Sequence, residues 1–342
     1  MARAFITGLS GTVLTPEERS FLRESEPWGL ILFNRNVEAP DQLRLLIASF
    51  REAVGRQAPV LVDQEGGRVQ RLGPPHWPKY PAGAHYGRLW EIDRARALDA
   101  ARLGGRLIAA DLLPLGIDVD CLPLADVPVA DADPVIGDRA YGASVAKVSA
   151  IAAAIAEGLM EGGVLPVLKH LPGHGRANAD SHLALPTVTA DRTSLQAVDF
   201  AAFRPLAHLP LGMTAHVVFS AFDPIAPATT SRTMVQEVIR DSIGFKGALM
   251  TDDISMGALS GAIEARSAAA LAAGCDIVLH CNGRIGEMRA VAAAVPPLSG
   301  RANVRAAAAL AAKRAPREID AQARARFAAL CAAAEGRDTV RS

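Results

Sequence analysis

Short hydrophobic runs recur along the chain, and each of them ends in polar residues or glycine. Most are continuously apolar instead of alternating with polar residues, a pattern typical of strands that are buried on both faces of a parallel sheet. Eight runs share this character: 4–11, 28–35, 59–67, 117–127, 164–173, 212–219, 247–256 and 275–282. They predict eight β-strands.

Stretches rich in Ala, Leu and Arg lie between most of these runs and have helical spacing. Examples are 41–54, 96–113, 145–160 and 262–274. Eight strands that alternate with helices predict an α/β fold, namely a single closed (β/α)8 barrel of the TIM type. A doubly wound open sheet is the alternative, but no predicted strand is followed by the GxGxxG motif of its dinucleotide-binding members.

No linker or low-complexity segment divides the chain, so we expect one barrel domain over residues 1–335 and a frayed tail over 336–342. The Pro- and Gly-rich segment 73–87 is too long for a tight turn. Long loops in compact domains are often functional, although this segment could also be a surface excursion packed over a Trp. After about residue 300 the Ala-rich sequence predicts further helix.

Composition narrows the possible partners and the compartment. The chain has 342 residues, half of them hydrophobic, and its 36 basic residues balance 36 acidic ones. Without a net charge we expect neither nucleic acid nor a membrane as a partner, and no run of eighteen apolar residues predicts a membrane span. The first residues read as a strand instead of a signal peptide, and the four cysteines form no CxxC pair. We therefore expect a cytoplasmic protein with reduced cysteines, and a monomer is favoured although the oligomeric state is left open.

Unusual polar residues gather at the ends of the predicted strands. In a (β/α)8 barrel the C-terminal strand ends form one rim, where active sites lie. Each residue alone has a structural explanation as a helix cap, a surface cation or a satisfied core histidine. Together on one rim they favour a functional site. They are Asp63 to Arg68, Arg71, Asp138, Arg139, Lys169, His170, Thr214 to His216, Thr251 to Asp253, His280 and Asn282.

The segment KHLPGHGRANADSH (169–182) carries three histidines in fourteen residues. A zinc site needs a rigid set of ligands, whereas this segment is Gly-rich and does not match HExxH. A phosphate-binding loop is also possible, although the segment does not match GxxxxGK[ST]. A third interpretation is acid–base chemistry, because Asp180 could hold one ring nitrogen of His182 and leave the other for a substrate.

Five motifs occur in the order typical of glycoside hydrolase family 3, namely residues 62–72, 133–142, 169–182, 213–219 and 251–256. The chain resembles the single-domain bacterial β-N-acetylglucosaminidases of that family, which act as β-hexosaminidases in peptidoglycan recycling. The resemblance extends to about residue 300. It implies a (β/α)8 barrel and retaining hydrolysis of a terminal β-1,4-linked N-acetylglucosamine through a covalent glycosyl-enzyme. The implied substrate is a muropeptide fragment, N-acetylglucosamine linked to an anhydro-muramic sugar with or without its peptide.

The same resemblance assigns roles to residues of this chain. It implies Asp252 as the nucleophile, His182 as the acid/base and Asp180 as its partner. Contacts to the sugar hydroxyls and the acetamido group fall on Asp63, Arg71, Arg139, Lys169 and His170. We expect neighbouring Lys or Arg side chains to keep Asp252 ionised. No metal and no cofactor is implied.

Two departures and three alternatives accompany these assignments. Glycosidases usually use two carboxyl groups, so a histidine acid/base is unusual. Many relatives have an acidic residue and a threonine after PGHG, where this chain has residues 176–179. We expect His174 to be structural and to bond loop backbone. A phosphorylase on the same site, a metal-dependent hydrolase using the three histidines and a non-catalytic sugar-binding barrel are the alternatives.

Overall fold

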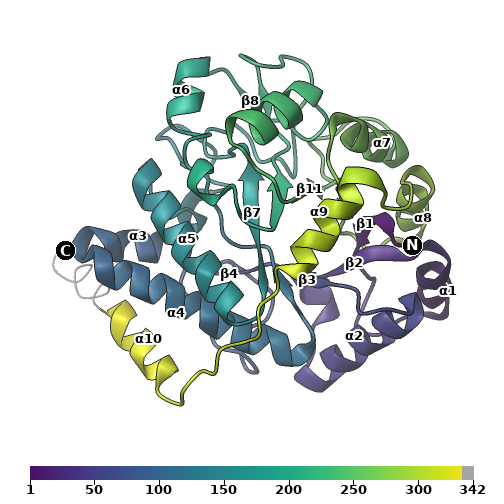
Figure 1. Ribbon diagram of the computed structural model, residues 1–342, viewed down its shortest axis with the longest axis horizontal. Helices are drawn as coiled ribbons and strands as arrows, with labels where there is room; N and C mark the ends of the chain where they lie inside the picture. Colours follow the sequence, from purple (N-terminus) through teal and green to yellow (C-terminus); the bar gives the residue numbers. More distant parts are fainter. Residues whose placement is uncertain (333–342) are drawn as a thin grey trace.

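The computed structural model describes residues 1–332 and shows eight parallel strands that close into a barrel (Figure 1). Around the barrel the strand order is β1, β12, β11, β9, β7, β6, β3 and β2. Their bounds are β1 Arg3–Thr7, β2 Pro27–Leu32, β3 Val60–Val62, β6 Val119–Asp120, β7 Leu165–Leu171, β9 Leu211–Thr214, β11 Ala248–Asp253 and β12 Ile277–His280. Each strand falls on one predicted run, so the predicted (β/α)8 barrel is confirmed.

Pairing of the first and last strands decides between the barrel and the open sheet. Strands β1 and β12 are parallel, with Phe5 opposite Val278 and Thr7 opposite His280. An open doubly wound sheet would leave two unpaired edges. That alternative is therefore wrong for this chain.

Helices cover the outside of the barrel. The four helices predicted over 41–54, 96–113, 145–160 and 262–274 agree with the structure within two residues at each end, whereas the helix predicted after about residue 300 is divided into two by residues 312–322. The bounds are α1 Pro16–Ser25, α2 Pro40–Val54, α3 Gly83–Ile92, α4 Arg94–Leu112, α5 Val145–Glu161, α6 Arg192–Ala197, α7 Ile263–Ala273, α8 Ile285–Ala294, α9 Gly300–Ala311 and α10 Ala323–Cys331. A π-helix spans η5 Met234–Ser242, and short 3-10 turns span η1 Asn34–Asn36, η2 Leu113–Leu115, η3 Gly137–Arg139 and η4 Arg204–Leu206.

The start of α1 shows how local sequence fixes these boundaries. The Thr15 hydroxyl accepts a hydrogen bond from the backbone N–H of Glu18, and the Glu18 carboxylate accepts one from the backbone N–H of Thr15. Pro16 occupies the first turn, where no backbone N–H is required. This capping box satisfies N–H groups that the helix itself cannot bond.

Two hydrophobic layers stabilise the barrel. Inward-facing side chains such as Ile6, Val167 and Met250 fill its interior, and a larger layer packs the strands against the helices. Ala306 and Ala309 of α9 pack with the interior layer. Helix α9 therefore closes the N-terminal end of the barrel, as its position over the strands in Figure 1 shows. The C-terminal strand ends lie at the opposite end.

Small elements and long connections complete the structure. Strands β4 Gln64–Gly66 and β5 Val69–Gln70 form a hairpin after β3, and β8 Thr187–Val188 pairs with β10 Val218–Phe219. Trp77, a residue of the 73–87 segment, is buried, and the last residues of this segment begin α3. The predicted tail at 336–342 and the predicted domain end at 335 lie outside the described residues.

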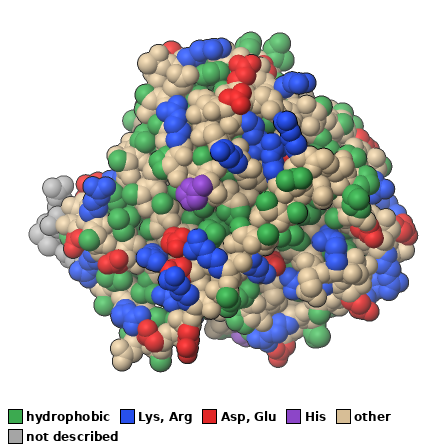
Figure 2. Space-filling model, viewed as in Figure 1, with side chains coloured by type: hydrophobic (Ala, Val, Ile, Leu, Met, Phe, Trp, Pro, Cys, Tyr) green, Lys and Arg blue, Asp and Glu red, His purple; other side chains and the backbone are tan. Residues whose placement is uncertain are grey.

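Charges of both signs mix over the surface. Figure 2 shows Lys and Arg side chains interspersed with Asp and Glu on the face that it presents. None of the helices within residues 1–332 combines the length and the hydropathy needed to cross a bilayer.

Candidate active site

A cavity of about 460 Å³ opens at the C-terminal end of the barrel strands. Residues of β2, β7, β9, β11 and β12 and of the segment that follows β3 contribute to its walls. Every residue predicted for the site lines this cavity: Asp63, Arg71, Arg139, Lys169, His170, Asp180, His182 and Asp252. The long 73–87 segment does not contribute a lining residue, which favours the surface interpretation of that segment.

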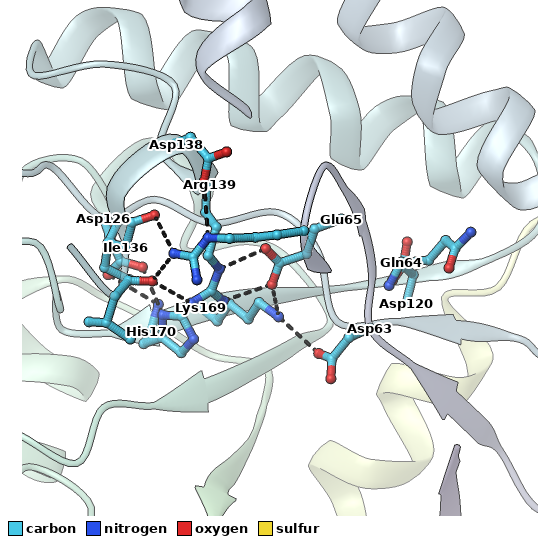
Figure 3. Close-up of polar contacts among 12 residues, drawn as sticks. Asp63, Gln64, Glu65, Asp120, Asp126, Ile136, Asp138, Arg139, Lys169 and His170 are labelled. Carbon is cyan, nitrogen blue, oxygen red and sulfur yellow. Dashed lines mark hydrogen bonds and ion pairs between the residues drawn. The ribbon is translucent and has the colours of Figure 1, made fainter. Parts of the chain in front are cut away.

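A network of buried charges forms one wall of the cavity (Figure 3). The Nζ atom of Lys169 lies 3.0 Å from Oδ1 of Asp63 and 2.6 Å from Oε1 of Glu65. Arg71 donates to the second oxygen of Asp63 at 3.0 Å. Arg139 binds Glu65 through two parallel bonds of 2.8 and 2.9 Å, the bidentate geometry that makes Arg–carboxylate pairs strong. Alternating charges thus fix one another in place.

The cations keep these buried carboxylates ionised. Burial alone would raise the pKa of Glu65, but Lys169 and Arg139 outweigh it and lower that pKa to about 2. The pKa of Asp63 falls well below its ordinary value because Lys169 and Arg71 likewise outweigh its burial. The network can therefore present fixed acceptors and donors to a polar ligand. Glu65 belongs to the motif at the end of β3, but sequence reasoning gave it no role.

Asp126 is a second residue whose role sequence reasoning missed. Its Oδ2 atom lies 2.7 Å from Nδ1 of His170, and its Oδ1 atom accepts the backbone N–H of His174 at 2.7 Å. Burial would raise the pKa of Asp126, and the two histidines lower it. The bond fixes the orientation of the His170 ring and leaves Nε2 of that ring for other contacts. The available signal in the sequence was an Asp within the apolar run 117–127, which does not by itself reveal the partner of that Asp.

Asp252 is the second-last residue of strand β11 and lines the cavity. The backbone N–H of Asp253 donates to its Oδ1 atom at 2.8 Å. Burial would raise the pKa of Asp252, but the imidazoles of His216 and His170 and this N–H lower it. The expectation that Lys or Arg would keep Asp252 ionised is therefore wrong, because the neighbours with this effect are histidines.

His216 is held firmly beside Asp252. Its Nδ1 atom lies 2.7 Å from the hydroxyl of Thr229, and its Nε2 atom lies 3.0 Å from the carbonyl oxygen of Asp253. Burial lowers the pKa of His216. Its bonds are those of a satisfied core histidine that supports the end of β11.

Asp180 and His182 form the predicted pair at the mouth of the cavity. Oδ1 of Asp180 lies 2.7 Å from Nδ1 of His182 and also accepts the backbone N–H of His182 at 2.9 Å. Although partial burial would raise the pKa of Asp180, these bonds lower it. The side chain of His182 is 63% exposed, so Nε2 is accessible from solvent and cavity. An imidazole with one nitrogen held by a carboxylate is suited to proton transfer at the other.

The remaining loop histidine behaves differently from the expectation. His174 does not bond loop backbone through its ring; Nε2 lies 3.0 Å from the hydroxyl of Ser181. Burial lowers the pKa of His174 to about 4, so the ring is neutral at neutral pH. His174 also lines the cavity. It connects the Asp126 end of the loop to the His182 end.

The unusual residues at 176–179 anchor the loop. Arg176 forms a 2.7 Å ion pair with the buried Asp199. The Asn178 side chain accepts the backbone N–H of Thr187 at 2.9 Å. This stretch therefore supplies its own contacts in place of the acidic residue and threonine of many relatives.

The geometry offers no support for the metal-dependent alternative. Within residues 1–332 no group of three or more His, Cys, Asp or Glu side chains is placed to hold a metal ion. His170 is paired with Asp126 and His182 with Asp180. The three histidines of the loop thus have separate partners.

The fold and this cavity define an enzyme of the (β/α)8 class with paired carboxylate and imidazole groups at its C-terminal rim. The glycosyl hydrolase family 3 N-terminal domain matches residues 9–311. The chain belongs to glycoside hydrolase family 3 and is a glycosidase.

Curated relatives and solved structures agree with this membership. The chain is 40% identical to a β-hexosaminidase of Alkalilimnicola ehrlichii over 281 residues, which cover 80% of this chain and 79% of that one. It is 38% identical to a β-hexosaminidase of Idiomarina loihiensis, with 84% and 86% covered. The crystal structure of NagZ from Neisseria gonorrhoeae with N-trifluoroacetyl-D-glucosamine superposes with a TM-score of 0.84 at 31% identity, and 98% of each chain is covered.

Proposed function

We propose that this protein is a retaining exo-β-N-acetylglucosaminidase that works through a covalent glycosyl-enzyme. The observation that carries the proposal is the presence in one cavity of an ionised carboxylate, Asp252, and a carboxylate-held imidazole, His182. Binding alone requires neither a nucleophile nor a proton donor. The β-hexosaminidase relatives and the N-acylglucosamine ligand of the gonococcal enzyme support the choice of sugar.

In the first step an oxygen of Asp252 attacks the anomeric carbon, and the bond to the leaving oxygen breaks. His182 gives that oxygen a proton from Nε2, and the sugar is left esterified to Asp252. Asp180 stabilises the charged imidazolium from which this proton comes, because it binds Nδ1.

The second step reverses the proton flow. Water attacks the anomeric carbon, Nε2 of His182 takes a proton from that water, and the ester to Asp252 breaks. The anomeric configuration is retained because it is inverted twice. As a base His182 is neutral, so it adds no second negative charge beside the glycosyl-enzyme.

The charged wall would hold the sugar for both steps. Asp63 and Lys169 are ionised and lie 3.0 Å apart, and each can exchange part of its bonding for a sugar hydroxyl. Arg71 and Arg139 are held by Asp63 and Glu65, respectively, and we assign them, with His170, to the remaining hydroxyl and acetamido contacts. Such preorganised polar groups place the reacting carbon without reorganisation at the moment of reaction.

The natural substrate in this proposal is a cell-wall fragment, N-acetylglucosamine β-1,4-linked to an anhydro-muramic sugar with or without its peptide. This assignment rests on family resemblance, as does a role in peptidoglycan recycling. A cytoplasmic location and a monomeric state are also part of the proposal, as expected from the sequence. Turnover of purified muropeptides, cell fractionation and sedimentation test these assignments separately.

A phosphorylase is the second candidate. The exposed His182 imidazole favours it, because a neutral base tolerates an anionic acceptor that a carboxylate would repel. Phosphate would then attack the anomeric carbon in place of water, and the product would be a sugar 1-phosphate.

The test is release of 4-nitrophenol from its β-N-acetylglucosaminide by the wild type and by Asp252→Ala. We expect turnover by the wild type, unchanged by chelator, and loss of about a thousandfold or more in the mutant because the covalent step is lost. A rate that depends on phosphate, with a sugar 1-phosphate product, identifies the phosphorylase. An inactive wild type contradicts the proposed function.

A further inference from the structure

The turn after the proposed nucleophile contacts the loop that carries the proposed acid/base. Residues 254–259 connect β11, which ends at Asp253, to the approach of α7. The backbone N–H of Gly257 donates to the carbonyl oxygen of His182 at 3.2 Å, and that of Ala258 donates to the carbonyl oxygen of Ser181 at 3.1 Å. Two consecutive N–H groups therefore hold the backbone at His182 itself.

The turn formed by residues 254–259 is itself fixed by hydrogen bonds to neighbouring elements. Asp253 accepts the N–H of Ser255 at 3.0 Å and its hydroxyl at 2.7 Å, and it also accepts the N–H of Cys281 at 3.1 Å. Arg266 donates to the carbonyl oxygens of Ile254 and Met256 at 3.1 and 3.2 Å. The turn is thus tied to β12 and to α7, both outside the histidine loop.

The close approach requires a residue without a side chain at 257. A β-carbon on Gly257 would lie 2.8 Å from the carbonyl oxygen of His182 and 3.0 Å from that of Leu183. Both atoms belong to backbone, which cannot move aside as a flexible side chain could. The φ angle of Gly257 is not in the left-handed region, so an Ala there meets a problem of space and not of backbone conformation.

The other contacts next to His182 stay within the loop, and they include backbone bonds from the N–H groups of Leu183 and Ala184 to the carbonyl oxygen of Asp180. Ser181 bonds the ring of His174 at 3.0 Å, and Asp180 bonds His182 within the loop. His182 itself is mostly exposed and has little packing to fix its position. The backbone contact with 257–258 is therefore the main link between the proposed acid/base and the strand that carries Asp252.

We propose that Gly257 is a positioning residue: by admitting the backbone of residues 182–183 into direct contact, it places Nε2 of His182 at the leaving-group oxygen. This inference rests on the proposed function, because it takes His182 as the acid/base. Displacement of His182 should harm proton transfer far more than sugar binding or nucleophilic attack. A misplaced catalytic group loses rate even when its chemistry is intact.

The test compares Gly257→Ala with Gly286→Ala. Gly286 is an exposed glycine of α8 where an added β-carbon meets no atom within 4 Å, so it is a matched control. Two substrates are used: 4-nitrophenyl β-N-acetylglucosaminide, whose leaving group needs little protonation, and N,N′-diacetylchitobiose, whose leaving group needs a proton. The readouts are kcat/KM, which reports the first step, and the melting temperature.

We expect Gly257→Ala to lower kcat/KM for the disaccharide by about tenfold or more, which is part of the roughly 10² to 10⁴ that acid–base catalysis contributes. For the nitrophenyl substrate the change should stay within about threefold, since attack by Asp252 needs no proton there. Gly286→Ala should leave both values and the melting temperature unchanged. The larger Gly257→Val should widen the difference between the two substrates.

Equal losses on both substrates, or no loss on either, would overturn the positioning role. A lower melting temperature with equal losses counts as the same negative result. His182→Ala is measured alongside as a reference for complete loss of the acid. If it shows no difference between substrates, or if the wild type is inactive, the proposed function fails and not the inference about Gly257 alone.

Discussion

Two lysine–aspartate pairs at opposite ends of the barrel have the same chemistry but different settings. Lys169 and Asp63 meet at the C-terminal rim, with Nζ 3.0 Å from Oδ1. Lys313 and Asp118 meet at the N-terminal end, with Nζ 2.9 Å from Oδ2. The Lys169 side chain is 2% exposed, whereas that of Lys313 is 37% exposed. Distance alone therefore does not distinguish a site from a structural contact.

The partners of each pair explain the difference. The other oxygen of Asp118 accepts the backbone N–H of Val60 at 2.8 Å. The Lys313–Asp118 pair at the N-terminal end of the barrel therefore joins the start of β3 to the segment after α9. In the Lys169–Asp63 pair at the C-terminal rim, Lys169 also forms an ion pair with Glu65, and Asp63 also accepts a hydrogen bond from Arg71. This pair lines the cavity. The Lys313–Asp118 pair thus hydrogen-bonds other parts of the chain and stabilises the fold. The Lys169–Asp63 pair instead places ionised groups beside a cavity that a ligand can fill.

The largest expected effect comes from Lys169→Met. This change leaves Asp63 and Glu65 buried without their shared cation, and breaking such a pair costs about 3–5 kcal/mol. We expect the free energy of unfolding in urea to fall by that amount and the glycosidase activity to be lost. A stability within about 1 kcal/mol of the wild type would show that the carboxylates are better solvated than their burial implies.

Lowering the pH should reduce the stability of the folded protein through His174, which lies at the C-terminal rim of the barrel. Its pKa in the folded protein is about 4, below the ordinary 6.5, so the folded state binds fewer protons than the unfolded state between these values. Stability due to neutral His174 is thus complete above pH 6.5 and is lost as pH falls towards 4. The loss amounts to at most about 3 kcal/mol.

Urea unfolding from pH 7 down to pH 4.5 measures this effect in the wild type and in His174→Gln. The variant keeps an amide that can bond Ser181 but has no titrating group, so its stability should decline less steeply. His216 and His280 titrate in both proteins and cancel in the difference. Parallel curves would contradict the assignment of a depressed pKa to His174.

The smallest effect on stability and activity is expected for Lys313→Met at the N-terminal end of the barrel. Its ion pair is partly exposed to solvent, and such pairs contribute about 0–1 kcal/mol. We expect a melting temperature slightly below that of the wild type and an unchanged kcat/KM. Loss of activity in this variant would contradict a purely structural role of the Lys313–Asp118 pair, because it would show that this end of the barrel affects the active site.

The sequence predicted the barrel and the rim residues because both depend on local patterns. Continuous apolar runs mark buried strands, and polar residues after them mark the rim, so Asp63, Lys169 and Asp252 could be placed together. The roles of Glu65 and Asp126 could not be predicted this way. Their partners, Arg139 and His170, come from segments 74 and 44 residues away, and only the folded barrel decides which cation reaches which carboxylate.

Local patterns also failed where tertiary packing overrides them. A cation was expected beside Asp252, but strand β9 and the residues after it bring His216 there instead. The ring of His174 was expected to bond loop backbone, but Ser181 returns to it after seven residues. Contacts such as that of Gly257 with His182 join segments far apart in sequence and have no local signal.

The most direct test of the account is to trap the glycosyl-enzyme. A fluorinated N-acetylglucosaminyl fluoride should esterify the nucleophile readily and be released slowly, so that peptide mass spectrometry can locate the sugar. We predict one added sugar on the peptide that contains Asp252 and none in Asp252→Asn. A sugar on another residue, or turnover by the wild type with inversion of the anomeric configuration, would contradict the claim that Asp252 is the nucleophile of a retaining enzyme.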